Sequence, residues 1–471
     1  MVIASRACRT RPHAHPAPAV AYRRREDVTV GLFRCGTALL PLKITGATAD
    51  MFPHIDETSS ASNSSGGQFH PYSVRSGSRN NSSSTIICLS HLRWDFVFQR
   101  PQHLMTRAAQ NHDVIFFEEP IFQPGILPRL DLSPREGGVI VAVPMLPEGL
   151  PQNMVVGQQR SMLDDLLASR AGRRLTAWFY TPMAMAFANH ITADVTVYDC
   201  MDELSAFRGA PPAMLRMEQA LIDQADLVFT GGRSLHDAKR HRHPHVHCFP
   251  SSIDTAHFGQ SRAGLPEPEA LKGLPHPRIG LFGVVDERMD LDLVAEIAAR
   301  RRDWSVVIIG PVVKVDPASL PQGPNLSWLG GRGYAALPAY LANWDLGFMP
   351  FALNESTRFI SPTKTPEFLA AGLPVVSTPV VDVVRDYGDA GLVEIAATAE
   401  EMVAHADALL HRPRAAWLAR VDAQLSTNSW DLTWARMSGL IRQAARPMQM
   451  PQATAGGGPF VTAAAAGVAN V

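Results

Sequence analysis

The sequence predicts an α/β protein made of two doubly wound domains. Short apolar runs, typical of buried parallel strands, alternate with helical patterns in both halves of the chain. A stretch rich in Pro and Gly at residues 260–277 separates the halves and reads as a linker. We therefore predict an N-terminal domain at residues 85–259 and a C-terminal domain at residues 278–428.

Composition narrows the class of protein. The chain has 471 residues, 46% apolar and 18% charged, and a formal net charge of −1, as expected for a soluble globular protein of two or three domains. No global basic field is present to attract nucleic acid, and no apolar run approaches the roughly 18 residues of a membrane span. A peripheral membrane contact stays open. Five scattered cysteines without a CxxC pair favour a reducing cytoplasm: Cys8, Cys35, Cys88, Cys200 and Cys248.

Neither end of the chain reads as a domain. Residues 1–84 include a polar tract, with too few large apolar side chains to offset the entropy of ordering. We predict a disordered extension there and a disordered tail, rich in Ala, Gly and Pro, at residues 447–471. Met51 is an alternative start, which leaves open whether residues 1–50 belong to the native protein.

The first half opens with a strand–helix–strand unit at residues 85–90, 102–110 and 112–117. Its first loop, residues 91–100, should lie at the carboxyl edge of the sheet, where ligands bind. The alternative is that its aromatic side chains only cover the sheet edge. Further strands are expected at residues 138–143, 176–180, 195–199, 227–230 and 247–250, and helices at residues 158–170, at 212–224 and from about Ser234.

Two or three carboxylates cluster at the end of the strand at residues 195–199: Asp199, Asp202 and Glu203. A carboxylate in a cleft can act as a general base on an acceptor hydroxyl when burial raises its pKa. The alternative is that Asp202 caps the next helix. Four histidines at residues 241–247 invite a metal interpretation, but Pro244 and the lack of converging elements favour an exposed loop, so no metal site is expected.

The second half repeats the pattern, with strands at residues 278–283, 304–310, 325–330 and 346–350, and helices at 291–300, 334–342, 399–411 and 415–424. Arg288 follows the first of these strands in a loop that should face the interdomain cleft. The alternative is a salt bridge to Asp286 or Asp290. Gly283 lets the backbone approach a ligand closely.

Residues 361–378 read as a loop, a short helix and a buried strand. Thr365 is expected to cap the helix, with Pro366 in its first turn and Gly372 in left-handed conformation after its end. Glu367 then lies in the first turn beside Lys364. Such a group can bind a ligand that carries hydroxyls and phosphates, or Glu367 can simply complement the helix dipole.

A final amphipathic helix is expected at residues 429–446, with Ser429 as its cap. Trp430, Trp434 and Met437 share one face of this helix, together with Leu440 or Ile441. Such a face is consistent with a plain packing helix or with a bridge back to the first domain.

Two stretches carry a family resemblance. Residues 364–376, KTPEFLAAGLPVV, resemble the nucleotide-sugar motif of GT-B glycosyltransferases of the retaining family-4 type. Residues 94–103, WDFVFQRPQH, resemble the opening motif of bacterial glycosyltransferases that build surface polysaccharides, including teichuronic-acid-type enzymes. The resemblance implies two Rossmann-like domains facing across a cleft, with the last helix crossing back to the first domain. The chain departs from the family at Phe359, where a second Glu is usual, which leaves Asn354 or Glu355 to contact the sugar.

The resemblance also implies roles for residues. Glu367 would accept hydrogen bonds from the ribose of a nucleotide diphosphate sugar, Arg288 would hold the diphosphate, with Lys364 or Arg358 as a second cation, and Asp202 or Asp199 would face the acceptor. The remaining predicted substrate contacts are Ser361, Thr363, Gly283, Asp95, Arg100 and His103.

The implied reaction is transfer of a sugar to a glycan or lipid-linked acceptor, with retention of configuration and without a metal or other cofactor. The alternatives are a sugar-nucleotide 2-epimerase of the same fold and a non-catalytic GT-B subunit.

Overall fold

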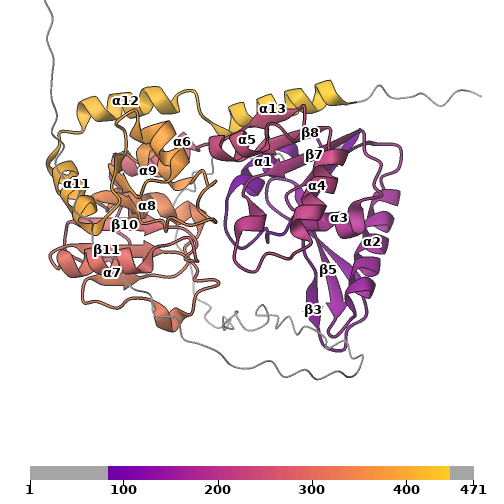
Figure 1. Ribbon diagram of the computed structural model, residues 1–471, viewed down its shortest axis with the longest axis horizontal. Coiled ribbons are helices and arrows are strands. Elements are labelled where there is room, and N and C mark those ends of the chain that lie inside the picture. Colours follow the sequence, from indigo (N-terminus) through magenta and orange to yellow (C-terminus); the bar gives the residue numbers. More distant parts are fainter. Residues whose placement is uncertain (1–82, 446–471) are drawn as a thin grey trace, which may run out of the picture. The chain divides into compact units, whose positions relative to one another are not determined.

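The structure is a computed structural model that describes residues 83–445 (Figure 1). The tail predicted at residues 447–471 and nearly all of the extension predicted at residues 1–84 lie outside the described part. All described residues belong to one compact unit, which contains two separate β-sheets.

The first sheet has nine strands in the order β3-β5-β2-β1-β6-β7-β8-β9, with β4 paired to β5. Every pairing is parallel except the one between β4 and β5. Parallel strands end at a common edge, so the loops after β1 and β7 lie at one end of the sheet. The strands are β1 (Ser84–Leu89), β2 (Asp113–Phe117), β3 (Ile121–Gln123), β4 (Arg129–Pro134), β5 (Val139–Pro147), β6 (Arg174–Phe179), β7 (Val195–Cys200), β8 (Leu227–Thr230) and β9 (Val246–Cys248).

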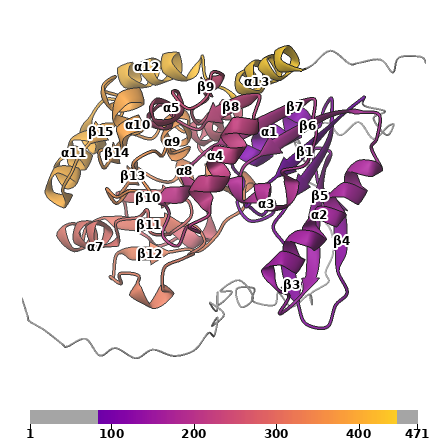
Figure 2. The same cartoon turned by 45° about the vertical axis from the view of Figure 1, so that its right-hand side comes forward.

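Helices cover both faces of this sheet, because successive side chains of β1 point to opposite faces and are buried on both. Ile86 and Cys88 belong to a cluster that also contains apolar side chains of α1, whereas Ile87 and Leu89 pack in a cluster with α2, α3 and α4. Figure 2 shows α2 and α3 on the same side of the sheet. The helices of this half are α1 (Arg100–Ala108), α2 (Gln152–Ala168), α3 (Met185–Ala188), α4 (Met214–Gln224) and α5 (Arg233–Lys239).

The second sheet is wholly parallel, in the order β12-β11-β10-β13-β14-β15. Its strands are β10 (Arg278–Phe282), β11 (Ser305–Ile309), β12 (Leu326–Trp328), β13 (Leu346–Met349), β14 (Val375–Ser377) and β15 (Glu394–Ile395). The later helices are α6 (Thr255–Gly259), α7 (Leu291–Arg300), α8 (Leu337–Ala342), α9 (Lys364–Ala370), α10 (Val381–Val383), α11 (Ala399–His411), α12 (Ala415–Leu425) and α13 (Trp430–Ala444). None of the helices between residues 83 and 445 combines the length and hydropathy that crossing a bilayer requires.

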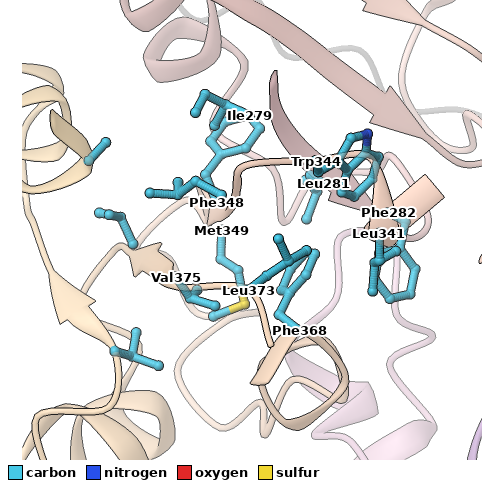
Figure 3. Close-up of a cluster of buried hydrophobic side chains, with 14 of the residues drawn as sticks. Ile279, Leu281, Phe282, Leu341, Trp344, Phe348, Met349, Phe368, Leu373 and Val375 are labelled. Atoms are coloured by element: carbon cyan, nitrogen blue, oxygen red, sulfur yellow. The ribbon is translucent and has the colours of Figure 1, made fainter. Parts of the chain in front are cut away.

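Two glycines shape the core beneath the second sheet. A Cβ atom at Gly280 would lie 2.0 Å from the ring of Trp344, and one at Gly347 would lie 2.8 Å from the ring of Phe368. The missing side chains therefore make room for two large rings against the strands. Figure 3 shows Phe368 and Leu373 in the buried cluster beside Met349. This packing fixes α9, whose first turn holds Lys364 and Glu367.

The last helix packs against the first sheet. Trp430, Met437 and Ile441 of α13 are buried in the same cluster as Ile86 of β1. The Arg107 guanidinium of α1 binds the Asp431 carboxylate at 2.7 Å. Ser429 caps the helix, as predicted, and accepts a hydrogen bond from the Leu432 N–H. Figure 1 shows α13, in yellow, beside α1.

Most predicted elements lie within two residues of their observed bounds, and the differences have local causes. The prediction missed β3 and β4, whose side chains are largely exposed and show no buried alternation. Helix α2 begins at Gln152, six residues before the predicted start, because Pro151 already provides its first boundary. The predicted helix at residues 334–342 is a 3₁₀ turn (Tyr334–Ala336) followed by α8.

Candidate functional site

Helix α9 places a buried ion pair at the carboxyl edge of the second sheet. The Lys364 ammonium contacts the Glu367 carboxylate at 3.0 Å, and only 8% of the Glu367 side chain is exposed. Burial raises the pKa of Glu367 above its ordinary value of 4.5, although Lys364 opposes that rise. The ammonium also lies 4.7 Å from the ring centroid of Phe282. A carboxylate and an ammonium are thus held side by side where β10 ends.

The predicted cap of this helix was wrong. The N-cap position is Thr363, whose side chain makes no capping hydrogen bond. Thr365 is the second residue of the helix. Thr365 is instead buried, with its hydroxyl 3.5 Å from the sulfur of Met349. The left-handed conformation predicted for Gly372 is confirmed by its φ of 80°.

Two glycines expose main-chain atoms in the larger of two cavities at this sheet edge. A Cβ atom at Gly310 would lie 1.6 Å from the carbonyl oxygen of Gly283, so a side chain is excluded there. Gly283 itself has a φ of 146°, and a Cβ atom added to it would meet the Lys364 side chain at 3.3 Å. These two glycines bring the loops after β10 and β11 together and leave main chain open to a ligand.

Arg288 takes part in an ion pair and also lines the site. Its guanidinium donates to both carboxylate oxygens of Asp286, at 2.7 Å for the shortest contact, which is the alternative weighed from the sequence. The Arg288 side chain remains 26% exposed and contributes to the smaller of two cavities. The ring of Phe207 lies 5.5 Å from its guanidinium carbon.

Two cavities meet at Lys364. The larger has a volume of about 530 Å³ and includes Asp95 and Glu367 in its lining, and the smaller has a volume of about 160 Å³ and includes Asp202. Both are lined by Val97 and Phe282 as well as by Gly283 and Lys364. Since four residues are shared, an elongated ligand can extend from one cavity into the other past the Lys364 ammonium.

The two acceptor-side carboxylates are in different settings. Asp202 lines the smaller cavity, and burial raises its pKa while Arg288 opposes the rise. Asp199 is fully buried, lines neither cavity, and accepts two hydrogen bonds from Arg100, at 2.9 and 3.1 Å. The prediction that Asp199 acts as a base is therefore wrong, because both of its carboxylate oxygens bind the buried Arg100 guanidinium and the side chain lines neither cavity.

The other predicted contacts divide into two groups. Arg100, Ser361 and Thr363 line the smaller cavity, and Asp95 lines the larger one while it pairs with Arg135. The remaining side chains line neither cavity. Arg358 and Glu355 are exposed and lie 3.6 Å from each other, Asn354 bonds to the main chain of Glu287, and His103 is buried and stacks on Trp430.

Phe359, which replaces the second Glu of the family motif, has a packing role. It is partly buried against the apolar cluster of the first sheet, with the Arg358 guanidinium 5.1 Å from its ring centroid. An apolar side chain at this position therefore joins the loop before α9 to the other sheet.

Sequence reasoning missed the aromatic and basic rim of the larger cavity. Phe98 stacks on Tyr334 with ring centroids 4.5 Å apart, and Arg332 donates to the Tyr340 hydroxyl at 2.9 Å. The sequence signal that could have indicated this rim is Arg332, which lies between Gly331 and Gly333 shortly after β12. The stacking partners are more than two hundred positions apart, so no local pattern joins them.

Within residues 83–445, no group of three or more His, Cys, Asp and Glu side chains could hold a metal ion. Of the histidines at residues 241–247, His243 bonds to the Ala225 carbonyl through Nε2 and His245 packs against its ring.

Comparison with known proteins agrees with this geometry. Residues 277–412 match the family model described as glycosyl transferases group 1. The chain is 27% identical over 239 residues to TuaH of Bacillus subtilis (strain 168), a protein named for a glycosyltransferase role in teichuronic acid biosynthesis. This match covers 46% of the chain and 59% of the relative, so it spans about three fifths of that protein's length.

Solved structures show the same fold. An α,α-trehalose-phosphate synthase (UDP-forming) from Burkholderia vietnamiensis aligns with a TM-score of 0.55 at 14% identity, over 77% of this chain and 99% of that chain. A sucrose-phosphate synthase from Thermosynechococcus elongatus aligns with a TM-score of 0.55 at 14% identity, over 76% and 98%. The predicted α/β fold of GT-B type is therefore confirmed, and so is the resemblance to GT-B glycosyltransferases.

Proposed function

Because residues 277–412 match the family model described as glycosyl transferases group 1, we propose that the protein is a glycosyltransferase. It moves a sugar from a nucleotide diphosphate sugar to a glycan or lipid-linked acceptor. The observation that carries the proposal is the convergence of Gly283, Arg288, Lys364 and Glu367 on two joined cavities.

The nucleoside occupies the larger cavity in this proposal. Glu367 lines that cavity and offers carboxylate oxygens to ribose hydroxyls, and Lys364 lies at the junction with the smaller cavity. When a diphosphate arrives, the Lys364 ammonium exchanges the Glu367 carboxylate for a phosphate, and Glu367 becomes free to accept from the ribose. The existing 3.0 Å pair thus holds both groups ready for the donor.

Catalysis then rests on stabilising the leaving diphosphate. Negative charge grows on the departing oxygen while the sugar becomes oxocarbenium-like. Arg288 and Lys364 both line the smaller cavity and are positioned to balance that charge. Fixed donors of this kind contribute on the order of 10²- to 10³-fold each. Such stabilisation needs no metal ion, so we propose a metal-independent reaction, and undiminished turnover in EDTA is the expected result.

Asp202 faces the position of the transferred sugar. Its raised pKa and its place in the smaller cavity support a role toward the acceptor hydroxyl or the developing positive charge. We propose retention of configuration, in which Asp202 is not the base of an in-line displacement. NMR of the first product anomer tests this: an inverted linkage rejects retention and makes Asp202 the general base.

The biological setting is proposed from the relative that is named for teichuronic acid biosynthesis. We propose that the protein takes part in the synthesis of a cell-surface polysaccharide from nucleotide sugars, in the cytoplasm at the inner face of the membrane.

A thermal-shift screen with UDP-, GDP- and dTDP-sugars tests the donor class without knowledge of the acceptor. Stabilisation by one nucleotide series supports the proposal, and no shift with any of them rejects it. Product formed from the donor sugar nucleotide alone would indicate an epimerase instead.

A further inference from the structure

Three side chains from loops of both sheets come together and have no part in the scheme above. They line neither cavity, but Glu287 directly precedes Arg288, which lines the smaller one. Glu287 follows β10, Lys314 follows β11, and His91 follows β1, so each comes after the carboxyl end of a parallel strand. The Lys314 ammonium lies 3.9 Å from a Glu287 carboxylate oxygen, and its charge acts on His91. Lys314 therefore links the other two side chains.

Three polar atoms of this group have no hydrogen-bond partner. Both carboxylate oxygens of Glu287 and the Nδ1 atom of His91 are buried without a hydrogen-bond partner. The neighbouring buried carboxylates differ: Asp286 binds Arg288, and Glu367 binds Lys364. A buried charged acceptor that makes no hydrogen bond costs stability, so Glu287 calls for an explanation that its neighbours do not need.

The unsatisfied atoms are all hydrogen-bond acceptors. Burial, and after it the charge of Lys314, lowers the pKa of His91 to about 4, so its imidazole is neutral at pH 7. His91 also hydrogen-bonds to the backbone of Tyr180, and its buried Nδ1 atom has no hydrogen-bond partner. Two carboxylate oxygens and one imidazole nitrogen complement hydroxyl groups, which donate, and Glu287 repels phosphate or carboxylate groups.

Phe207 connects this group to the smaller cavity. Its ring centroid lies 5.5 Å from the guanidinium carbon of Arg288 on one side and 5.2 Å from the ammonium of Lys314. The adjacent Arg208 guanidinium donates to the Lys314 carbonyl at 2.7 Å. The loop that carries Asp202 is thereby joined to Lys314.

We propose that Glu287, His91 and Lys314 form a subsite for the hydroxyl groups of an uncharged acceptor sugar. This inference rests on the proposed function, and it names the acceptor at this point as a neutral sugar unit rather than a phosphate or a uronic acid. Glu287 and His91 accept from the hydroxyls, and the Lys314 ammonium pairs with Glu287.

Saturation-transfer NMR on the full-length protein tests the subsite, with the nucleoside diphosphate found by the thermal-shift screen present at saturation. The probes are the methyl glycosides of glucose, galactose, mannose and N-acetylglucosamine, with glucose 6-phosphate as the charged comparison. At least one neutral glycoside is expected to bind, and to bind more tightly than glucose 6-phosphate. Glu287→Gln should weaken that binding about ten-fold and leave nucleotide affinity unchanged.

Thermal stability separates this role from a structural one. Because Glu287 makes no hydrogen bond, Glu287→Gln should keep or raise the melting temperature, whereas loss of a needed ion pair would lower it. The matched control is Glu355→Gln, an exposed carboxylate outside both cavities, which should change nothing. His91→Leu provides a second variant with the same expected loss of glycoside binding.

Three results would overturn the subsite: no glycoside binds the wild type, glucose 6-phosphate binds more tightly, or both variants bind glycosides normally. If nucleotides bind and glycosides do not, only the subsite fails. If no nucleotide binds, the proposed function itself fails.

Discussion

The two sheets contribute their charged side chains to the site in opposite ways. On the second sheet, Arg288 and Lys364 pair with carboxylates but remain 26% and 19% exposed at the cavity wall. On the first sheet, Arg100 and Asp199 also pair, but their side chains are 5% and 0% exposed. The chemistry of these pairs is similar, but Asp199 lines neither cavity, and of this pair only Arg100 contributes to the smaller one.

Whether a ligand can reach an ion pair decides whether the pair can exchange partners. A cation at a cavity wall can exchange its carboxylate for a phosphate, because the released carboxylate still reaches solvent or ligand hydroxyls. A sealed pair cannot exchange partners without leaving an uncompensated buried charge. We infer that the second sheet supplies exchangeable cations and that the first supplies a fixed support beneath the acceptor side.

Removing Asp199 should have the largest effect on stability. Asp199→Ala leaves the Arg100 guanidinium buried without its carboxylate partner, which costs about 3–5 kcal/mol. Asp202→Ala removes a half-buried carboxylate at the wall of the smaller cavity and should cost less than about 1 kcal/mol. Urea unfolding of the two variants measures the difference. Equal stabilities would contradict the contrast between a sealed carboxylate and one that lines a cavity.

Removing a cation from the cavity wall should affect turnover rather than folding. Lys364→Met and Arg288→Met should each lower kcat on the order of 10²- to 10³-fold, since each removes a donor to the leaving diphosphate. Arg358→Met is the matched control, because its side chain is 62% exposed and lines neither cavity. Steady-state rates of the three variants decide the matter, and an Arg358→Met loss as large as the others would refute the assignment.

The acceptor side should also respond to acid. Burial lowers the pKa of His91 from 6.5 to about 4, so the unfolded chain binds this proton more readily than the folded one. The stability that neutral His91 contributes is full above pH 6.5 and is lost as the pH falls toward 4. Between pH 7 and pH 5 the loss is about 2 kcal/mol. His91→Gln should flatten the urea-unfolding profile over this range, and an unchanged slope would contradict the expectation.

The rim of the larger cavity should give the smallest effect. Phe98→Ala removes a ring stacked 4.5 Å from Tyr334, and such aromatic pairs contribute about 1 kcal/mol. Phe96→Ala, at a ring that is 50% exposed, should stay within about 0.5 kcal/mol of the wild type. Thermal unfolding compares the two variants. If Phe96→Ala is the more damaging, the stack is not what holds this rim.

Local patterns explain why much of the fold could be predicted. Fully buried strands such as β11 appear as uninterrupted apolar runs, and α7 begins directly after Asp290, whose side chain caps it. Lys364 and Glu367 could be assigned together because side chains three positions apart on a helix lie on the same face. Strands β3 and β4 could not be predicted, because their exposed side chains leave no alternation to detect.

The parts of the site that escaped prediction depend on long-range contacts. Asp199 was interpreted as a base because its place after a strand is typical of one, and the arginine that saturates it lies 99 positions away. Phe98 and Tyr334 meet only because the loops of the two sheets face each other. A sequence pattern indicates which side chains reach a sheet edge, but not which partners they find there.

The central claim is that Lys364 and Glu367 form the binding site of a nucleotide diphosphate. Isothermal titration calorimetry of the wild type, Glu367→Ala and Glu355→Ala with the nucleoside diphosphate selected by the thermal-shift screen tests it most directly. The account predicts binding at least ten-fold weaker for Glu367→Ala and unchanged for Glu355→Ala. Wild-type affinity in Glu367→Ala would contradict it.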